Sequence, residues 1–120
     1  MSVMEYSRPF LGEIVSVVID RPLGTKHPKH DYVYPVNYGY VPDTVAPDGA
    51  ELDVYVLGEE KPLKEYTGRC IAIIHRTNDD DDKLIITQDH MNFNDQEIRD
   101  LTRFQEQWFE SEIVRPTKPE

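Results

Sequence analysis

The segment that most constrains the fold of this chain runs from Tyr34 to Val56 and reads YPVNYGYVPDTVAPDGAELDVYV. Tyrosines recur at even spacings in its first part, and acidic or aromatic residues alternate with aliphatic ones over residues 51–56. Alternation with a period of two is typical of β-strands. Residues 42–49, between the two runs, are rich in Pro, Asp and Gly, which favour turns. The segment is therefore predicted to form a strand, an acidic turn and a second strand.

Three carboxylates, those of Asp48, Glu51 and Asp53, fall within or just after this turn. Asp53 lies inside an otherwise apolar strand, where an unpaired charge would be costly. A divalent cation with oxygen ligands is the obvious compensating group. The segment therefore predicts a metal site.

Composition limits the classes of protein to consider. The chain has 120 residues, which fits one small domain spanning residues 1–120. It has 23 acidic and 13 basic residues and a net charge of -10, which argues against nucleic-acid binding. No apolar run is long enough to cross a membrane, and the N-terminus lacks a signal-peptide pattern. The single cysteine, Cys70, rules out an intrachain disulfide, so we expect a cytoplasmic setting and a buried structural thiol.

The rest of the chain predicts further strands and one helix. Residues 1–10 show little periodicity and are expected to be a loose lead-in. Strands are expected over residues 13–20, covered on both faces, and over 67–76 and 84–87. A helix should begin at Asn94, which forms a capping-box pattern with Glu97. Its apolar stripe, expected to pack in the core, comprises Ile98, Leu101, Phe104, Trp108 and Phe109. This order predicts a mostly β fold, a small closed barrel with one C-terminal helix.

Residues 21–31 form the densest basic cluster of this acidic chain, and two prolines and a glycine predict a loop there. The cluster can be an ordinary solvated surface or a loop that grips phosphate. We favour the second interpretation, with Arg21 as the best candidate for a bidentate contact and with Lys26 and His27 beside it. His27 and His30 also have a spacing used by zinc ligands on helices, but a loop with Pro28 favours solvated histidines.

Residues 37–40 (NYGY) and 48–54 (DGAELDV) resemble the soluble, magnesium-dependent inorganic pyrophosphatases of the OB-fold type. The resemblance extends from about Ile19 to Ile86 and implies an OB-type barrel. The family carries an Asp-x-Asp-x-x-Asp metal motif, whose first and last positions fall on Asp48 and Asp53. The middle position, a metal ligand that helps to activate water in the family, is Ala50 here. Glu51 is the candidate substitute.

A second acidic segment, residues 79–83, also resembles the family. The family has an acidic loop here that ends in Asp-x-Lys, and Asp81-Asp82-Lys83 matches that ending. The early aspartate of the loop falls on Asn78 or Asp79. Without the resemblance, such a run would be read as a solvated hairpin tip.

The resemblance implies a set of site residues. The metal ligands would be Asp48, Asp53, Asp79 and Asp81, for magnesium, with manganese as the alternative ion. The catalytic residues would be Asp53, Glu51, Tyr38 and Lys83. Tyr38 and Lys83 would hold the phosphate oxygens, and the basic loop adds Arg21, Lys26 and His27 as candidates to hold pyrophosphate. Self-association into a homo-oligomer is expected by analogy with the family.

Three functions stay open at this point. The chain can be a small inorganic pyrophosphatase, a phosphohydrolase for another diphosphate or phosphoester, or a non-catalytic module that binds metal or phosphate. Asp48, Asp53, Tyr38 and Lys83 support the first function. Ala50, and the lack of a counterpart to the Tyr-Lys pair near the end of family members, support the other two.

Overall fold

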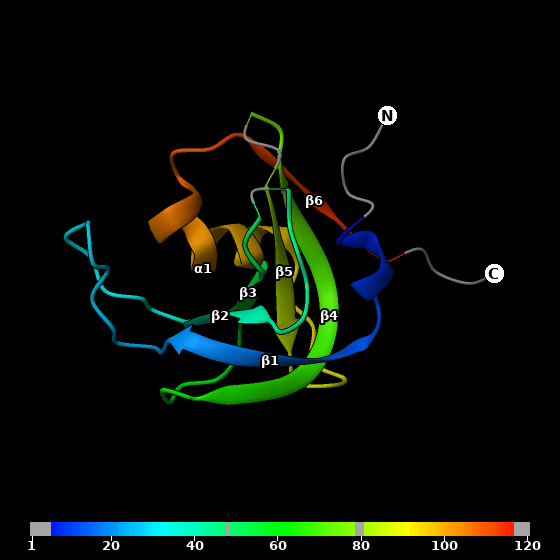
Figure 1. The fold of residues 1–120 in the computed structure, drawn as a ribbon, viewed down its shortest axis with the longest axis horizontal. Coiled ribbons are helices and arrows are strands. Elements are labelled where there is room, and N and C mark those ends of the chain that lie inside the picture. The colour runs from blue at the N-terminus through cyan, green and yellow to red at the C-terminus, as the bar shows by residue number, and fades with distance from the viewer. Residues whose placement is uncertain (1–5, 48, 79–80, 117–120) are drawn as a thin grey trace.

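The computed structural model describes residues 6–47, 49–78 and 81–116, and Figure 1 shows a barrel with one helix beside it. The elements follow in chain order: a 3-10 turn η1 (Arg8–Phe10), β1 (Ile14–Arg21), β2 (Asn37–Val41), β3 (Leu52–Val56), β4 (Glu65–Arg76), β5 (Asp82–Thr87), α1 (Asp95–Glu106) and β6 (Ser111–Val114). The strand order is β1-β2-β3-β5-β4-β6, and β1 also pairs with β4. That last pairing closes a five-stranded barrel and confirms the predicted fold class.

The barrel closes because β4 is long enough to serve two partners. Its first half pairs with β1, from Val18 opposite Glu65 to Ile14 opposite Arg69. Its second half lies between β5 and β6, and a register shift between Cys70 and Ala72 marks a bulge in its pairing with β5. Bulges bend a strand and increase its twist, which suits a strand that must change partners along its length.

The strands differ in how they are covered. In β1, buried residues alternate with more exposed ones, so only one of its faces is covered. The expectation that both faces of this strand are covered is therefore wrong. All six residues of β5 are buried. The apolar cluster inside the barrel covers one face of this strand, and the apolar cluster beneath α1 covers the other face. Two apolar clusters result, one inside the barrel and one beneath α1.

Gly39 sits where two strands approach closely. It lies opposite Ile19 in the pairing of β1 with β2. A Cβ atom at this position would lie 1.9 Å from the backbone oxygen of Val18. Only glycine therefore fits at the centre of the Tyr-Gly-Tyr sequence, which holds β2 against β1 next to Tyr38.

The helix begins as predicted and ends sooner. Asn94 accepts a hydrogen bond from the backbone of Glu97, whose side chain accepts one from the backbone of Asn94, so the capping box is confirmed. Ile98 is fully buried under the helix. Trp108, however, lies beyond the end of α1 and is 59% exposed. Its assignment to the core is wrong, because the helical periodicity stops at Glu106.

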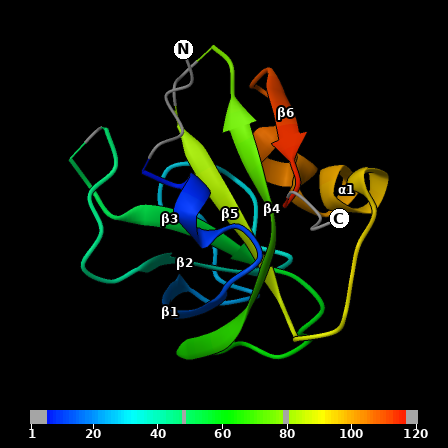
Figure 2. The same cartoon turned by 90° about the vertical axis from the view of Figure 1, so that its right-hand side faces the viewer.

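Two segments are more ordered than the sequence predicts. β6 follows the helix and pairs with the end of β4, and Figure 2 shows α1 and β6 on the same side of the barrel. The described part of the N-terminal lead-in is anchored to β5, because Asp82 accepts a hydrogen bond from the Ser7 hydroxyl and donates its backbone N–H to the Tyr6 hydroxyl. Among the described residues, no helix is long and apolar enough to cross a membrane.

Candidate functional site

A pocket of about 640 Å³ lies between the loop that follows β1, the middle of the barrel and the residues just after α1. Its charged lining comprises Asp20, Arg21, Asp53, Arg76 and Lys83. Its remaining lining is mostly aromatic and comes from the loop, from Tyr38 on β2, from Gln105 on α1 and from the chain just beyond α1. The pocket therefore combines acidic groups, basic groups and aromatic rings.

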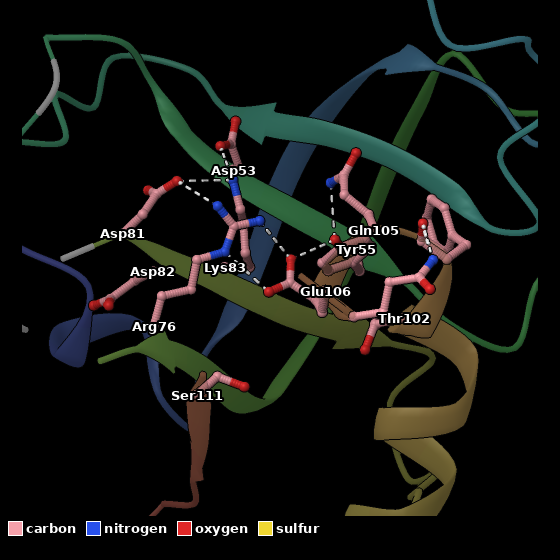
Figure 3. A network of polar contacts seen from close by, with 12 residues as sticks. Asp53, Tyr55, Arg76, Asp81, Asp82, Lys83, Thr102, Gln105, Glu106 and Ser111 are labelled. Atoms are coloured by element: carbon pink, nitrogen blue, oxygen red, sulfur yellow. Dashed lines mark hydrogen bonds and ion pairs between the residues drawn. The ribbon is translucent and has the colours of Figure 1, made fainter. Parts of the chain in front are cut away.

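Lys83 is at the centre of the charged part. β3 and β5 pair in parallel, and Asp53 lies opposite Lys83 in that pairing. The Lys83 ammonium lies 2.5 Å from Asp53 Oδ2 and 3.0 Å from Asp81 Oδ2, and it donates a hydrogen bond of 3.1 Å to the Tyr38 hydroxyl. Figure 3 shows Asp53 and Asp81 converging on this ammonium. Four residues proposed from the sequence are thus brought together.

The buried Lys83 stays charged. Burial by itself lowers the pKa of the ammonium, but the oxygen groups of Tyr38, Asp53 and Asp81 outweigh burial and leave the pKa raised. Burial likewise raises the pKa of the Tyr38 hydroxyl, which therefore remains a neutral phenol at neutral pH. The site thus presents one fixed cation and one hydroxyl to the pocket.

Arg76 forms a second charged cluster beside the first. Its Nε and Nη2 donate hydrogen bonds of 2.9 and 2.7 Å to the two carboxylate oxygens of Glu106. Both side chains are nearly fully buried. Arg76 also lies 3.5 Å from Asp81, and its guanidinium stacks 3.6 Å above the ring of Phe109. This arrangement connects the end of α1 to the loop that carries Asp81 (Figure 3).

The sequence analysis missed Arg76 and Glu106. The signal that could have found Arg76 is the one applied to Asp53: a charged residue in an apolar strand requires a partner. Arg76 is the last residue of the apolar strand β4. For Arg76 the partner lies 30 residues away on a helix, so no local pattern could name it. Glu106 also accepts a hydrogen bond of 2.7 Å from the buried Tyr55 hydroxyl.

Arg21 lies at the end of β1 and lines the pocket. A register shift in the pairing of β1 with β2 falls between Ile19 and Arg21. Within the described part of the chain, the Arg21 guanidinium forms no hydrogen bond or ion pair. It is therefore available to a ligand, unlike the guanidinium of Arg76.

The two other predicted residues of the basic loop lie in different environments. Lys26 is exposed and forms an ion pair of 3.5 Å with Asp31, and it does not line the pocket. His27 lines the pocket, and its Nδ1 accepts backbone hydrogen bonds from Lys29 and His30 at 3.0 and 3.2 Å. Burial, with help from nearby positive groups, lowers the pKa of His27 below its usual value.

The first acidic turn is only partly described. Asp48 and Asp79 lie outside the described residues. Ala50 and Glu51 are exposed and precede β3, and neither lines the pocket. Glu51 nevertheless lies near enough to Asp20 to contribute, after burial and together with Asp53, to the raised pKa of that carboxyl.

The residues that meet at Lys83 suit a weakly held, hydrated cation. The side chains of Asp53 and Asp81 are 30% and 21% exposed, so neither carboxylate is fully buried, and Asp53 lines the pocket. In the ranges that the structure describes, no three His, Cys, Asp or Glu side chains form a metal cage. Magnesium is usually bound through one or two carboxylates together with substrate phosphates. The donor set therefore fits magnesium better than it fits a metal enclosed by protein ligands.

Comparison with known proteins agrees with this geometry. Residues 13–114 match the family model described as inorganic pyrophosphatase. An inorganic pyrophosphatase from Pseudomonas syringae pv. tomato is 42% identical over 48 residues, which cover 38% of this chain and 27% of the relative. The matched region thus spans about a quarter of that relative's length.

Solved structures show the same fold. The inorganic pyrophosphatase of Ehrlichia chaffeensis has a TM-score of 0.64 at 19% identity, and the match covers 82% of this chain and 83% of that chain. The enzyme of Helicobacter pylori has a TM-score of 0.62 at 17% identity, and the match covers 92% and 88% of the two chains. Because the family model matches most of the sequence, the chain belongs to the inorganic pyrophosphatase family.

Proposed function

We propose that this chain hydrolyses inorganic pyrophosphate to two phosphate ions in the pocket around Lys83. The observation that carries the proposal is the meeting of Asp53, Asp81 and Tyr38 at the Lys83 ammonium. Lys83, Asp53 and Tyr38 line the pocket, and the available guanidinium of Arg21 lies in the same lining. Phosphoryl transfer requires positioning and charge neutralisation more than covalent chemistry. The pocket offers groups for both tasks.

The roles follow from charge and geometry. Lys83 and Arg21 attract the phosphate oxygens, and Arg21 can bind two of them at once through its planar fork. The neutral Tyr38 hydroxyl donates a hydrogen bond to the same anion. Asp53 and Asp81 are the carboxylates that hold the metal, and Asp48 and Asp79 stay predicted ligands. A bound divalent ion would neutralise phosphate charge and lower the pKa of a bound water.

Magnesium is the ion we propose, with manganese as the alternative. We also propose a cytoplasmic setting and self-association. The cytoplasmic setting is supported by Cys70, a single, fully buried thiol whose pKa burial raises to about 12. Self-association follows by analogy with the family, and light scattering on the purified chain measures it.

Phosphate release from pyrophosphate tests the proposed function. The wild-type chain should release phosphate with millimolar magnesium, about the range that a weak carboxylate site requires. Phosphate release should stop when a chelator is added. Melting temperature should rise with magnesium concentration, because a ligand that binds the folded state stabilises it. No phosphate release with magnesium or manganese, together with a melting curve unaffected by either ion, would overturn the proposal.

A further inference from the structure

The pocket is larger than a bare diphosphate needs. Its volume of about 640 Å³ falls within the range of roughly 300–1,000 Å³ that is typical of sites for organic ligands. The charged groups account for only part of the lining. Most of the rest is aromatic and includes a ring wall, and the rings of His30, Tyr32 and Trp108 in it have no role in the proposed hydrolysis of pyrophosphate.

This ring wall comprises His27, His30, Tyr32 and Trp108. The Trp108 ring lies 6.1 Å from the His30 ring and 6.3 Å from the Tyr32 ring, measured between centroids, with interplanar angles of 25° and 24°. The rings of His30 and Tyr32 are tilted by only 11° relative to each other. The wall thus presents several nearly parallel ring faces on the side of the pocket formed by the loop and the chain beyond α1.

Packing explains the inner rings but not the outer ones. Tyr32 and Tyr34 donate hydrogen bonds of 3.2 and 3.1 Å to Gln105, and both rings contact Phe104 edge-on. These contacts hold the loop against α1. Trp108 is different, because it is 59% exposed although it lines the pocket. A tryptophan that is only partly covered by its neighbours keeps surface available for stacking.

The ring wall lies beside the phosphate-binding groups. Arg21 ends β1, just before the loop that carries three of these rings, and lines the pocket together with them. It lines the same pocket as Lys83. A ligand with a flat ring at one end and phosphates at the other would therefore meet matching groups at both ends. Nucleic-acid bases stack on aromatic side chains with little regard to base identity.

We propose that this pocket accepts nucleoside diphosphates and triphosphates, with the base stacked on Trp108 and the phosphates held by Arg21 and Lys83. The inference rests on the proposed function, since it assigns the same hydrolysis to a larger substrate. The oxygen of water bonds to the terminal phosphorus and the bond from that phosphorus to the bridging oxygen breaks. For ADP the products are AMP, phosphate and one proton, with the bridging oxygen leaving on AMP.

Trp108 provides the test, because it is the only tryptophan in the chain. Its fluorescence should be quenched by the non-hydrolysable α,β-methylene analogue of ADP. Methylenediphosphonate, which has the phosphates without the base, should leave the fluorescence nearly unchanged. In calorimetry the nucleotide analogue should bind about tenfold more tightly than methylenediphosphonate. Equal affinity of the two probes, or no quenching by the nucleotide analogue, would overturn the inference.

Variants separate stacking from folding. Trp108→Ala should lower the ratio of kcat/KM for ADP to that for pyrophosphate about tenfold, whereas Trp108→Phe should largely retain it. Ile14→Ala, at an exposed strand residue outside the pocket, serves as the control and should leave the ratio unchanged. An unchanged ratio in Trp108→Ala would overturn the inference.

The two proposals fail in different ways. Pyrophosphate hydrolysis without nucleotide binding overturns the inference and leaves the proposed function in place. Nucleotide binding and hydrolysis without pyrophosphate hydrolysis supports the ring wall as a base-binding surface and overturns the proposed function.

Discussion

Asp53 and Lys83 face each other across the parallel pairing of β3 and β5, with 2.5 Å between the carboxylate and the ammonium. The two residues are 30 positions apart in the sequence. Each follows one of the two acidic turns, so this single pair brings both turns to one place. Lys83 thereby compensates the charge of Asp53 that the sequence analysis assigned to a metal.

Asp53→Asn should remove most pyrophosphate hydrolysis, because the amide keeps the shape of the side chain but loses the charge that holds a cation. Lys83 retains Asp81 as a partner at 3.0 Å, so the fold should persist. Phosphate release and circular dichroism measure the two effects. Asp100→Asn, at an exposed helix position, is the matched control. A mutant that works at the wild-type rate would make Asp53 a structural residue.

Arg21→Ala should raise KM for pyrophosphate about tenfold or more while leaving the magnesium affinity of the free chain nearly unchanged. The reason is that the guanidinium lines the pocket without an ion-pair partner among the described residues, whereas the carboxylates carry the metal. A hydrogen bond to a charged group contributes about 1.5–3 kcal/mol. Steady-state kinetics and magnesium titration separate the two effects. Equal losses in both would assign Arg21 to the metal site or to the fold.

Ala50 replaces a carboxylate of the family motif, and its substitution should be informative. Ala50→Asp should raise the rate of pyrophosphate hydrolysis, because it supplies the missing oxygen ligand to a weakly active site. If Glu51 already acts as the substitute ligand, Glu51→Gln should abolish hydrolysis instead. Ala50 and Glu51 are both exposed and outside the pocket lining, and neighbouring residues of an extended chain point to opposite sides, so the two variants distinguish which position can reach the metal. If the wild-type chain releases no phosphate and neither substitution changes this, the result would favour a non-catalytic module.

Glu106→Ala should destabilise the fold strongly. It would remove the carboxylate that accepts two hydrogen bonds from the buried guanidinium of Arg76, and breaking a buried ion pair costs about 3–5 kcal/mol. The free energy of unfolding in urea measures the loss. Glu110→Ala, which removes an exposed carboxylate a few residues away, should change it by less than about 0.5 kcal/mol. Similar values for the two variants would show that the ion pair contributes little.

The loop around His27 should respond to pH. Its folded-state pKa is lowered below the ordinary value of 6.5, so the fold favours the neutral ring, whose Nδ1 accepts two backbone hydrogen bonds. This contribution to stability is present above pH 6.5 and is lost as pH falls from 6.5 through the folded-state pKa. NMR titration of the ring and melting temperatures across this window measure it. In His27→Gln the dependence should be smaller, and a ring that titrates above 6.5 would contradict the assignment.

Local chemistry was enough to predict much of the fold. The period of two located β2 and β3, the Asn94 capping box located the start of α1, and the apolar run around Cys70 predicted its burial. These features depend on residues close together in the sequence. Asp53 was found from its place in an apolar strand and the Asp-x-Lys ending from the family resemblance, and the structure brings Asp53, Asp81 and Lys83 together.

The remaining features depend on contacts between distant residues. β6 has only four residues and forms because β4 offers it an edge. Arg76 and Glu106 find each other only once α1 packs against the barrel. Trp108 continues the apolar spacing of the helix but lies beyond its end, so periodicity assigned it to the core rather than to the pocket.

The pairing of β4 with both β1 and β5 also determines when the molecule can fold during synthesis. The contacts that close the barrel join residues about fifty positions apart, Ile14 with Arg69 for example, and such non-local pairings form slowly because the long loop must first be closed. A nascent chain that ends before residue 82 lacks β5, and β3 and β4 then have no shared neighbour. Barrel closure must therefore wait until about three quarters of the chain has emerged, and until then the apolar residues of β3 and β4 stay available to chaperones.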